Sequence, residues 1–178
     1  MNIVIPNGAY RRMPWKNGGG TTELVATSGD DPPGWRVSRA SVASDGPFSD
    51  FAGYDRFIVL LEGEGCLLTV RGKLVMLDDW LVPFRFKGED PVDCVLVDGP
   101  CVDFNWMVRR EHFEGNVAVL RPGESAEAVA IYAVGDALLH AGESAEVPAG
   151  HTLVCRRQHV RLDFGGPVIA CDARPLLP

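Results

Sequence analysis

The sequence predicts an all-β protein, and three observations support this fold class. From Trp35 onward, apolar runs a few residues long and rich in Val, Leu, Ile and aromatic residues alternate with Gly, Pro and Asp. Such runs are typical of strands joined by turns. Only the stretch PGESAEAVAI, from Pro122, has enough Ala and Glu to suggest a helix, and we predict a strand there as well. The third observation is a weak internal repeat.

The repeat relates residues 57–85 to residues 130–156. Both segments have the order strand, Gly turn, strand, Gly turn, strand, acidic or Pro-Gly turn, strand. A unit of this type occurring twice predicts two related β-barrels fused in one compact chain. Similar turn spacing in any all-β chain is the alternative. We expect an N-terminal barrel over residues 1–110 that carries the ligand site, and a smaller barrel over residues 111–178 packed tightly on it.

Composition excludes several classes of protein. The chain has 178 residues, of which 46% are hydrophobic and 23% charged, as in soluble globular proteins. The purely apolar stretches, such as residues 57–61, are far too short to cross a bilayer, and the first residues lack the pattern of a secretory signal. We therefore expect a cytoplasmic protein with no membrane partner. A formal net charge of −7 argues against nucleic acid as a partner.

The charge is unevenly distributed. Basic and acidic side chains are equal in number over residues 1–56, so the excess of acids lies after Arg56. An anion site is therefore expected in the N-terminal third.

Cysteine and histidine spacing gives no support for metal or redox chemistry. The five cysteines are scattered without a CxxC pair, and we expect them to be reduced and buried. The four histidines include no His-x-His pair of the kind that barrel metal sites use. We therefore predict no metal ion and no cofactor.

A glycine-rich cluster, PWKNGGGTTEL over residues 14–24, is the first candidate for ligand binding. Three consecutive glycines allow close approach to the main chain, and Lys16, Asn17 and Glu23 add polar groups beside them. A phosphate loop needs its lysine after the last glycine, whereas Lys16 precedes the glycines. The cluster therefore indicates polar recognition, and a nucleotide site is not expected.

The strand predicted at residues 35–41, WRVSRAS, offers a second set of polar groups. Strand alternation puts Arg39 and Ser41 on one face with Trp35 and Val37. If that face points inward, Arg39 enters the barrel and needs a carboxylate from the protein or from a ligand. Arg56, if it is also buried, likewise needs a carboxylate from the protein or from a ligand.

Other polar and aromatic residues stand near these strands. Phe48, with Phe51 and Tyr54, supplies aromatic surface on a loop, either as a plug or as a pocket wall. Asn105, between Phe104 and Trp106, is either a satisfied core amide or a pocket donor. The carboxylates of Glu23 and Asp55 are candidates either for internal ion pairs with arginine or for a general acid-base pair, so an enzyme remains an alternative.

The strings PWKNGGGTTEL, WRVSRASVASDGPFSDFAGYDR, LLEGEG and DFNWMVRR together resemble the HutD/Ves family, and the resemblance covers most of residues 13–110. It implies a bicupin-type fold without the cupin metal ligands, commonly a homodimer, and bacterial cytoplasmic work linked to histidine utilisation. It implies no established reaction. It also implies binding of a small acidic intermediate such as urocanate or N-formylglutamate.

The family's pocket pattern is carried over to these positions of this sequence: Lys16, Asn17, Glu23, Arg39, Ser41, Phe48, Asp55, Arg56 and Asn105. We expect Lys16 and Arg56 to meet the carboxylate, and the uncharged polar side chains to hydrogen-bond the rest of the ligand. Phe48 would pack on its apolar or planar part, and Glu23 and Asp55 would orient the cations. A pure protein-interaction module that regulates the pathway is the third possibility.

Overall fold

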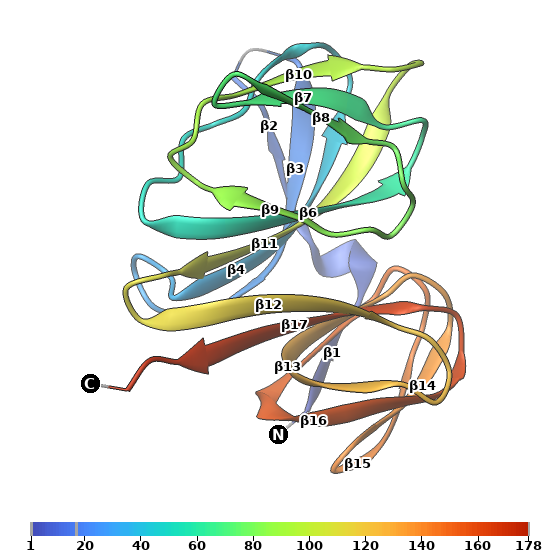
Figure 1. Cartoon of the computed structure of the whole chain (residues 1–178). Coiled ribbons are helices and arrows are strands. Elements are labelled where there is room, and N and C mark those ends of the chain that lie inside the picture. The colour runs from blue at the N-terminus through green and yellow to red at the C-terminus, as the bar shows by residue number, and fades with distance from the viewer. Residues whose placement is uncertain (1, 17, 178) are drawn as a thin grey trace. The chain divides into compact units, whose positions relative to one another are not determined.

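The computed structural model describes residues 2–16 and 18–177, and it consists almost entirely of strands (Figure 1). The all-β prediction is confirmed, and the strand expected after Pro122 is β13, Ser125–Ala133. One short 3-10 helix, η1, spans Asn7–Ala9. The chain divides into two compact units, which we call the Arg11–Glu111 unit and the terminal unit, the latter made of Met1–Tyr10 and His112–Pro178.

The Arg11–Glu111 unit contains two antiparallel sheets. The first has the order β2-β3-β4-β11-β6-β9. Its strands are β2 (Arg11–Pro14), β3 (Gly20–Thr27), β4 (Trp35–Val42), β11 (Cys101–Arg109), β6 (Tyr54–Glu62) and β9 (Phe84–Lys87). The second has the order β5-β10-β7-β8. Its strands are β5 (Gly46–Pro47), β10 (Val92–Leu96), β7 (Cys66–Val70) and β8 (Lys73–Leu77).

A hydrophobic core in this unit draws side chains from both sheets. Ile58 and Leu60 contribute from β6, and Leu68 and Cys94 from the four-stranded sheet. Because neighbouring residues of a strand point to opposite faces, the face that carries Ile58 and Leu60 also carries Arg56. The same face therefore supplies apolar core at one end and polar groups at the other.

The terminal unit is built on one seven-stranded sheet with the order β12-β17-β13-β16-β14-β15, and β1 also pairs with β16. Its strands besides β13 are β1 (Ile3–Ile5), β12 (Phe113–Leu120), β14 (Ala137–Ala141), β15 (Glu143–Val147), β16 (Thr152–Gly165) and β17 (Val168–Pro175).

Residues 1–10 group differently from the predicted ranges, which put them in the N-terminal barrel. The Ile3–Ile5 strand pairs antiparallel with Thr152–Val154, and the Tyr10 hydroxyl donates to the carbonyl of Gly150 at 2.7 Å. Both contacts join segments 140 or more residues apart in sequence. Local sequence pattern carries no information about a partner at that separation.

The two repeat segments fall on equivalent strands of the two units. In one, β6 is followed by the β7–β8 hairpin and by β9, which pairs with β6. In the other, β13 is followed by the β14–β15 hairpin and by β16, which pairs with β13. The predicted order of strands and turns is thus the same in both segments.

All five cysteines are buried as free thiols. Burial raises the pKa of the Cys171 thiol well above its ordinary value. Among the described residues, no helix combines the length and apolar character needed to cross a membrane.

Candidate functional site

A cavity of about 500 Å³ opens within the Arg11–Glu111 unit. Its size is in the range of pockets that bind small molecules. Strands β4, β6 and β11 supply most of its polar side chains, Arg36, Ser38, Arg56, Asp103 and Asn105. The β2–β3 turn and the segment after β5 supply much of its aromatic surface, Trp15, Phe48 and Phe51.

Arg56 is the most deeply buried cation of the cavity, with 5% of its surface exposed. Its Nη2 donates to Asn105 Oδ1 at 2.9 Å, and its Nη1 donates to the carbonyl of Ser49 at 3.3 Å. Its Nε has no hydrogen-bond partner among residues 2–16 and 18–177. Burial lowers the pKa of Arg56 to about 10, so the side chain is a cation at neutral pH with one donor unused.

Three phenylalanine rings surround the guanidinium of Arg56. Its Cζ lies 4.9 Å from the ring centre of Phe86, 5.2 Å from that of Phe51 and 5.5 Å from that of Phe48. Ring faces attract a cation electrostatically while excluding water. They therefore fix the guanidinium without using its hydrogen-bond donors.

Asp103 is a buried acid in the same cavity. Asn105 Nδ2 donates to Asp103 Oδ1, and Asn105 thereby links the carboxyl group to Arg56. Burial raises the pKa of Asp103 to about 7, although Arg56 and the Asn105 hydrogen bond both act to lower it. Near neutral pH this group is thus divided between its neutral and charged forms.

Arg36 adds a second guanidinium to the cavity wall. Its Cζ lies 5.3 Å from the ring centre of Phe51, and its Nε is buried without a hydrogen-bond partner in the described part of the chain. Burial is the main cause that lowers the pKa of Arg36. Two arginines with unused donors and only one nearby acid make the cavity suited to an anion.

The glycine cluster holds the rim of the cavity. The backbone N–H of Trp15 donates to the carbonyl of Gly20 at 2.9 Å, which closes the turn between β2 and β3. A Cβ on Gly20 would lie 2.4 Å from the carbonyl oxygen of Ser41 and 3.0 Å from the Trp15 ring. Glycine is required there because a Cβ would collide with the Ser41 carbonyl oxygen of the neighbouring strand, and the Trp15 ring packs closely on the same backbone. Trp15 Nε1 donates to Thr22 Oγ1 at 2.8 Å, which fixes the indole.

Four of the predicted ligand-binding residues line this cavity. They are Lys16, Phe48, Arg56 and Asn105. Lys16 is exposed at the rim, whereas Arg56 and Asn105 are buried. Asn17 lies outside the described residues.

Three other predicted residues, Glu23, Arg39 and Ser41, do not line the cavity. In β4, Arg36, Ser38 and Ala40 face the cavity, so alternation directs Arg39 and Ser41 to the opposite face of the sheet. There Arg39 forms ion pairs with Glu23 at 3.7 Å and with Glu62 at 3.3 Å. This is the internal ion pair that the sequence left open for Arg39.

Asp55 also lies away from the cavity, in an ion-pair network of its own. Its carboxylate accepts hydrogen bonds from Arg85 Nη2 at 2.6 Å and from Arg110 Nη1 at 2.9 Å. In the sheet, β4 and β11 separate Asp55 on β6 from Glu23 on β3, a spacing of about 14 Å across three strand intervals. The general acid-base pair considered for these two carboxylates has no support in this geometry.

Asp55→Asn is expected to destabilise the fold by about 1–3 kcal/mol, because a nearly buried carboxylate loses charge-assisted hydrogen bonds to two arginines. Urea unfolding monitored by circular dichroism measures the change, with Asp98→Asn at an exposed position as the matched control. Wild-type stability in Asp55→Asn would show that the network contributes nothing.

The sequence reasoning did not select Arg36, Ser38 and Asp103. In WRVSRAS, strand alternation puts Arg36 and Ser38 on one face and Trp35 and Val37 on the other. The apolar character of Trp35 and Val37 favours their face as the inward one. Trp35 instead packs against Trp106 on the opposite face, with ring centres 5.5 Å apart. For Asp103, the period of two from Asn105 was an available signal.

Within residues 2–16 and 18–177, no group of three or more His, Cys, Asp or Glu side chains is arranged to hold a metal ion. The polar groups of the cavity are mainly guanidinium and amide donors, which metal ions do not use as ligands.

Comparison with known proteins decides the family. The model of the HutD family matches residues 7–169. The chain belongs to the HutD family. This HutD-family chain is 42% identical over 115 residues to an uncharacterised 21.2-kDa protein of the hutC 3′ region of Pseudomonas putida. That match covers 61% of this chain and 58% of the relative. A protein Ves from Cronobacter sakazakii is 37% identical over 61% of this chain and 63% of its own length.

Two solved structures resemble the HutD-family chain over nearly its whole length. A conserved protein of unknown function from Pseudomonas aeruginosa PAO1 is 32% identical, with a TM-score of 0.87 and coverage of 99% of this chain and 100% of the other. HutD from Pseudomonas fluorescens SBW25, in a formate condition, is 30% identical, with a TM-score of 0.82 and coverage of 98% and 100%. A cupin 2 conserved barrel domain protein from Leptotrichia buccalis, 7% identical with a TM-score of 0.58 over 92% and 96%, shows a cupin-like fold alone.

Proposed function

We propose that this HutD-family protein binds a small carboxylate in the cavity of the Arg11–Glu111 unit and thereby modulates histidine utilisation in the cytoplasm. Arg56 carries the proposal, because its buried guanidinium lines the cavity and keeps its Nε donor unused. A buried cation needs an anionic partner, and Asp103, the single acid among the described residues that line the cavity, has a pKa of about 7 and so leaves that charge only partly balanced.

The remaining surface of the cavity suits the rest of such a ligand. Asn105 and Ser38 offer uncharged hydrogen-bonding groups, while Phe48, Phe51 and Trp15 offer apolar faces for a planar or aliphatic body. Urocanate and N-formylglutamate both have this chemistry, with a carboxylate, a further polar group and a short body between them.

We also propose a bicupin-like architecture for the chain, with one cupin-like barrel in each unit. The equivalent strand order of residues 57–85 and 130–156 supports it, as does the likeness to cupin-like structures.

Calorimetric titration of the purified protein with urocanate, N-formylglutamate and histidine tests the proposed function. We expect saturable binding of at least one of the two acids at pH 6.5, and weaker binding of histidine, because its ammonium group would approach Arg36 and Arg56. Formate serves as the smallest carboxylate probe, since a formate condition is named for the Pseudomonas fluorescens relative. Absence of heat with every probe up to millimolar concentration would refute the proposal.

The same titration mixtures separate a binding protein from an enzyme. Loss of the ultraviolet absorbance of urocanate, or release of formate from N-formylglutamate, would show turnover. We expect both acids to be recovered unchanged.

A further inference from the structure

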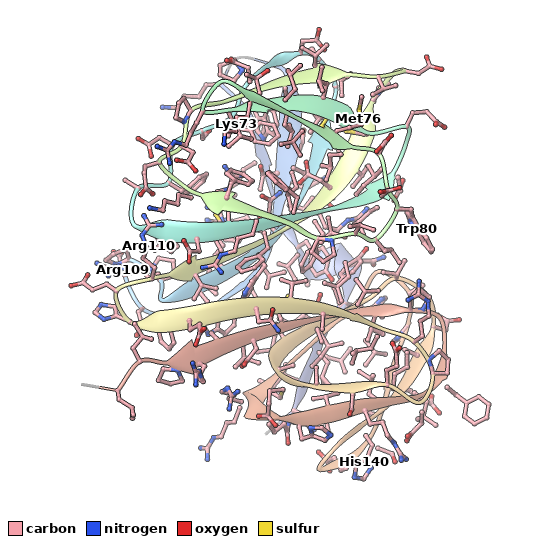
Figure 2. The ribbon with its side chains drawn as sticks, viewed as in Figure 1. Lys73, Met76, Trp80, Arg109, Arg110 and His140 are labelled. Atoms are coloured by element: carbon pink, nitrogen blue, oxygen red, sulfur yellow. The ribbon has the colours of Figure 1, made fainter. Side chains whose placement is uncertain are left out.

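The outer edge of β8 is an apolar strand edge without a partner. β8 ends the four-stranded sheet, and within residues 2–16 and 18–177 it pairs with β7 alone. Leu74 is 70% exposed and Met76 is 51% exposed, and Figure 2 shows Lys73 and Met76 towards opposite ends of the strand. An exposed apolar edge of this kind invites pairing with another strand.

The apolar surface continues from β8 across the outer face of the sheet. Met76 is in register with Leu67 on β7, and Leu67 is in register with Val95 on β10. Val95 is 49% exposed. The row therefore spans three neighbouring strands on the face away from the core, and it ends at the open edge of β8.

Hairpin geometry sets which backbone groups the open edge presents. β7 and β8 are joined by a two-residue turn, Arg71 and Gly72, with φ of 49° and 77°. In a hairpin of this type the residues that flank the turn, Val70 and Lys73, form a hydrogen-bonded pair, and hydrogen-bonded and non-hydrogen-bonded pairs then alternate. The N–H and C=O groups of Leu74 and Met76 therefore point away from β7.

The charge pattern of β8 and of the residues that flank it is complementary to itself in the antiparallel direction. The sequence RGKLVMLDD over residues 71–79 has basic side chains at its start, apolar ones in the middle and acids at its end. Antiparallel pairing of two copies about Val75 sets Leu74 opposite Met76 of the second copy, the residues whose backbone groups are unpaired. It also brings the basic end of each strand beside the acidic end of the other.

Parallel pairing of two copies would instead place like charges side by side, which destabilises cross-strand neighbours. A one-residue shift of the antiparallel register would send the apolar side chains to opposite faces. The order of charges, the face of the apolar side chains and the direction of the free backbone groups all favour antiparallel pairing of two copies about Val75.

We propose that β8 is a homodimer interface, in which two copies pair antiparallel through Leu74 and Met76 and join their four-stranded sheets into one. The occupant is a second copy of this chain, because its own edge carries the complementary charge order. Trp80, 57% exposed beyond Met76, then lies near the basic start of β8 in the second copy, where its ring can contact a cation.

Sedimentation velocity at 1–100 µM tests the interface on the full-length protein. We expect wild type to sediment as a dimer of twice the 19.3-kDa chain mass. The double variant Leu74→Lys with Met76→Lys should be monomeric, with a dimer Kd raised at least ~100-fold, because like charges would face each other across the pair. The matched control is Phe164→Lys, a 74% exposed apolar position in the terminal unit, and it should remain dimeric.

A charge exchange gives the sharper result. The acidic variant Lys73→Glu and the basic variant Asp78→Lys with Asp79→Lys should each be weakened as homodimers, and a mixture of the two should form a heterodimer. A monomeric wild type, a dimer unaffected by the Leu74 and Met76 changes, or a mixture without heterodimer would each overturn the proposal.

Discussion

Arg56→Met is expected to reduce affinity for the bound carboxylate by at least ~100-fold, the effect of removing one partner of a buried charge pair. Arg56 lines the cavity with its buried Nε unused, and three phenylalanine rings hold its guanidinium. Met fills part of the same volume without charge, so the aromatic wall keeps a packing partner. Calorimetric titration at pH 6.5 with the acid that binds wild type best measures the loss.

Arg39→Met is the matched control for this variant. It makes the same substitution in the same sheet, but Arg39 belongs to the ion pairs with Glu23 and Glu62 and does not line the cavity. We expect its affinity to stay within about twofold of wild type, because a screened ion pair outside the site does not touch the ligand. Near-ultraviolet circular dichroism confirms that both variants are folded.

Two results would contradict the role of Arg56. Unchanged affinity in Arg56→Met would place the carboxylate elsewhere, and equal losses in Arg39→Met would indicate a general effect on the sheet. Arg56→Lys adds a graded test. It keeps the charge but loses the planar fork, so its affinity should fall between wild type and Arg56→Met.

Carboxylate affinity is expected to decrease about tenfold per pH unit above pH 7 because of Asp103. Burial raises the pKa of this group to about 7, so below that pH it is largely neutral. A ligand carboxylate that enters the cavity repels the charged form of Asp103 and raises its pKa further. Binding above pH 7 therefore takes up one proton, and affinity falls as that proton becomes scarcer.

The other charged groups of the cavity do not produce this dependence. Arg56 loses its proton only near its pKa of about 10. Arg36, whose pKa burial lowers, should stay charged over the same interval, as guanidinium groups do. Asp103→Asn removes the titration, and Asn at position 103 can still accept from Asn105. We expect its affinity to vary little between pH 6 and 9 and to exceed that of wild type at pH 9.

Calorimetry at pH 6, 7, 8 and 9, in two buffers of different ionisation enthalpy, measures both affinity and proton uptake. A flat wild-type profile, or an equal slope in Asp103→Asn, would refute the coupling.

The same group makes folding depend on pH in the same direction. Its pKa in the folded state lies above the ordinary 3.8, so the folded state binds the proton more tightly. The stability that this provides is complete below about pH 3.8 and is lost as pH rises through about 7. Asp103→Asn should therefore raise the urea midpoint more at pH 8 than at pH 5.

The positions of strands and turns could be predicted from the sequence because they depend on local pattern. Runs such as RFIVLLEG and DFNWMV have strand composition, and glycines follow them where the chain must turn, as at Gly53, Gly63 and Gly72 with positive φ. The strands before Trp35 were not predicted, since β3 begins inside the glycine cluster at Gly20. These strands are held by their partners and not by their own composition: β3 pairs with β4, β2 with β3, and β1 with β16.

Part of the candidate site could be predicted in the same way. Lys16, Phe48, Arg56 and Asn105 were selected because cations, amides and aromatic residues in apolar surroundings suggest a pocket, and all four line the cavity. Glu23 and Asp55 were selected on the same chemistry, yet both belong to ion pairs away from it. Residue type alone does not show whether an arginine pairs with a carboxylate of the protein or with a carboxylate of a ligand.

The sequence by itself determined the all-β fold, the family, and the presence of two alternating faces along each strand. Only the tertiary structure decided which face encloses the cavity, because alternation defines two faces without naming the sheet that covers either one. In β4, Arg36 and Ser38 line the cavity, whereas Arg39 and Ser41, the residues expected from the sequence, lie on the other face. It also linked Asp103 to Arg56 through Asn105, although β6 and β11 are far apart along the chain, and it left the self-complementary edge of β8 open.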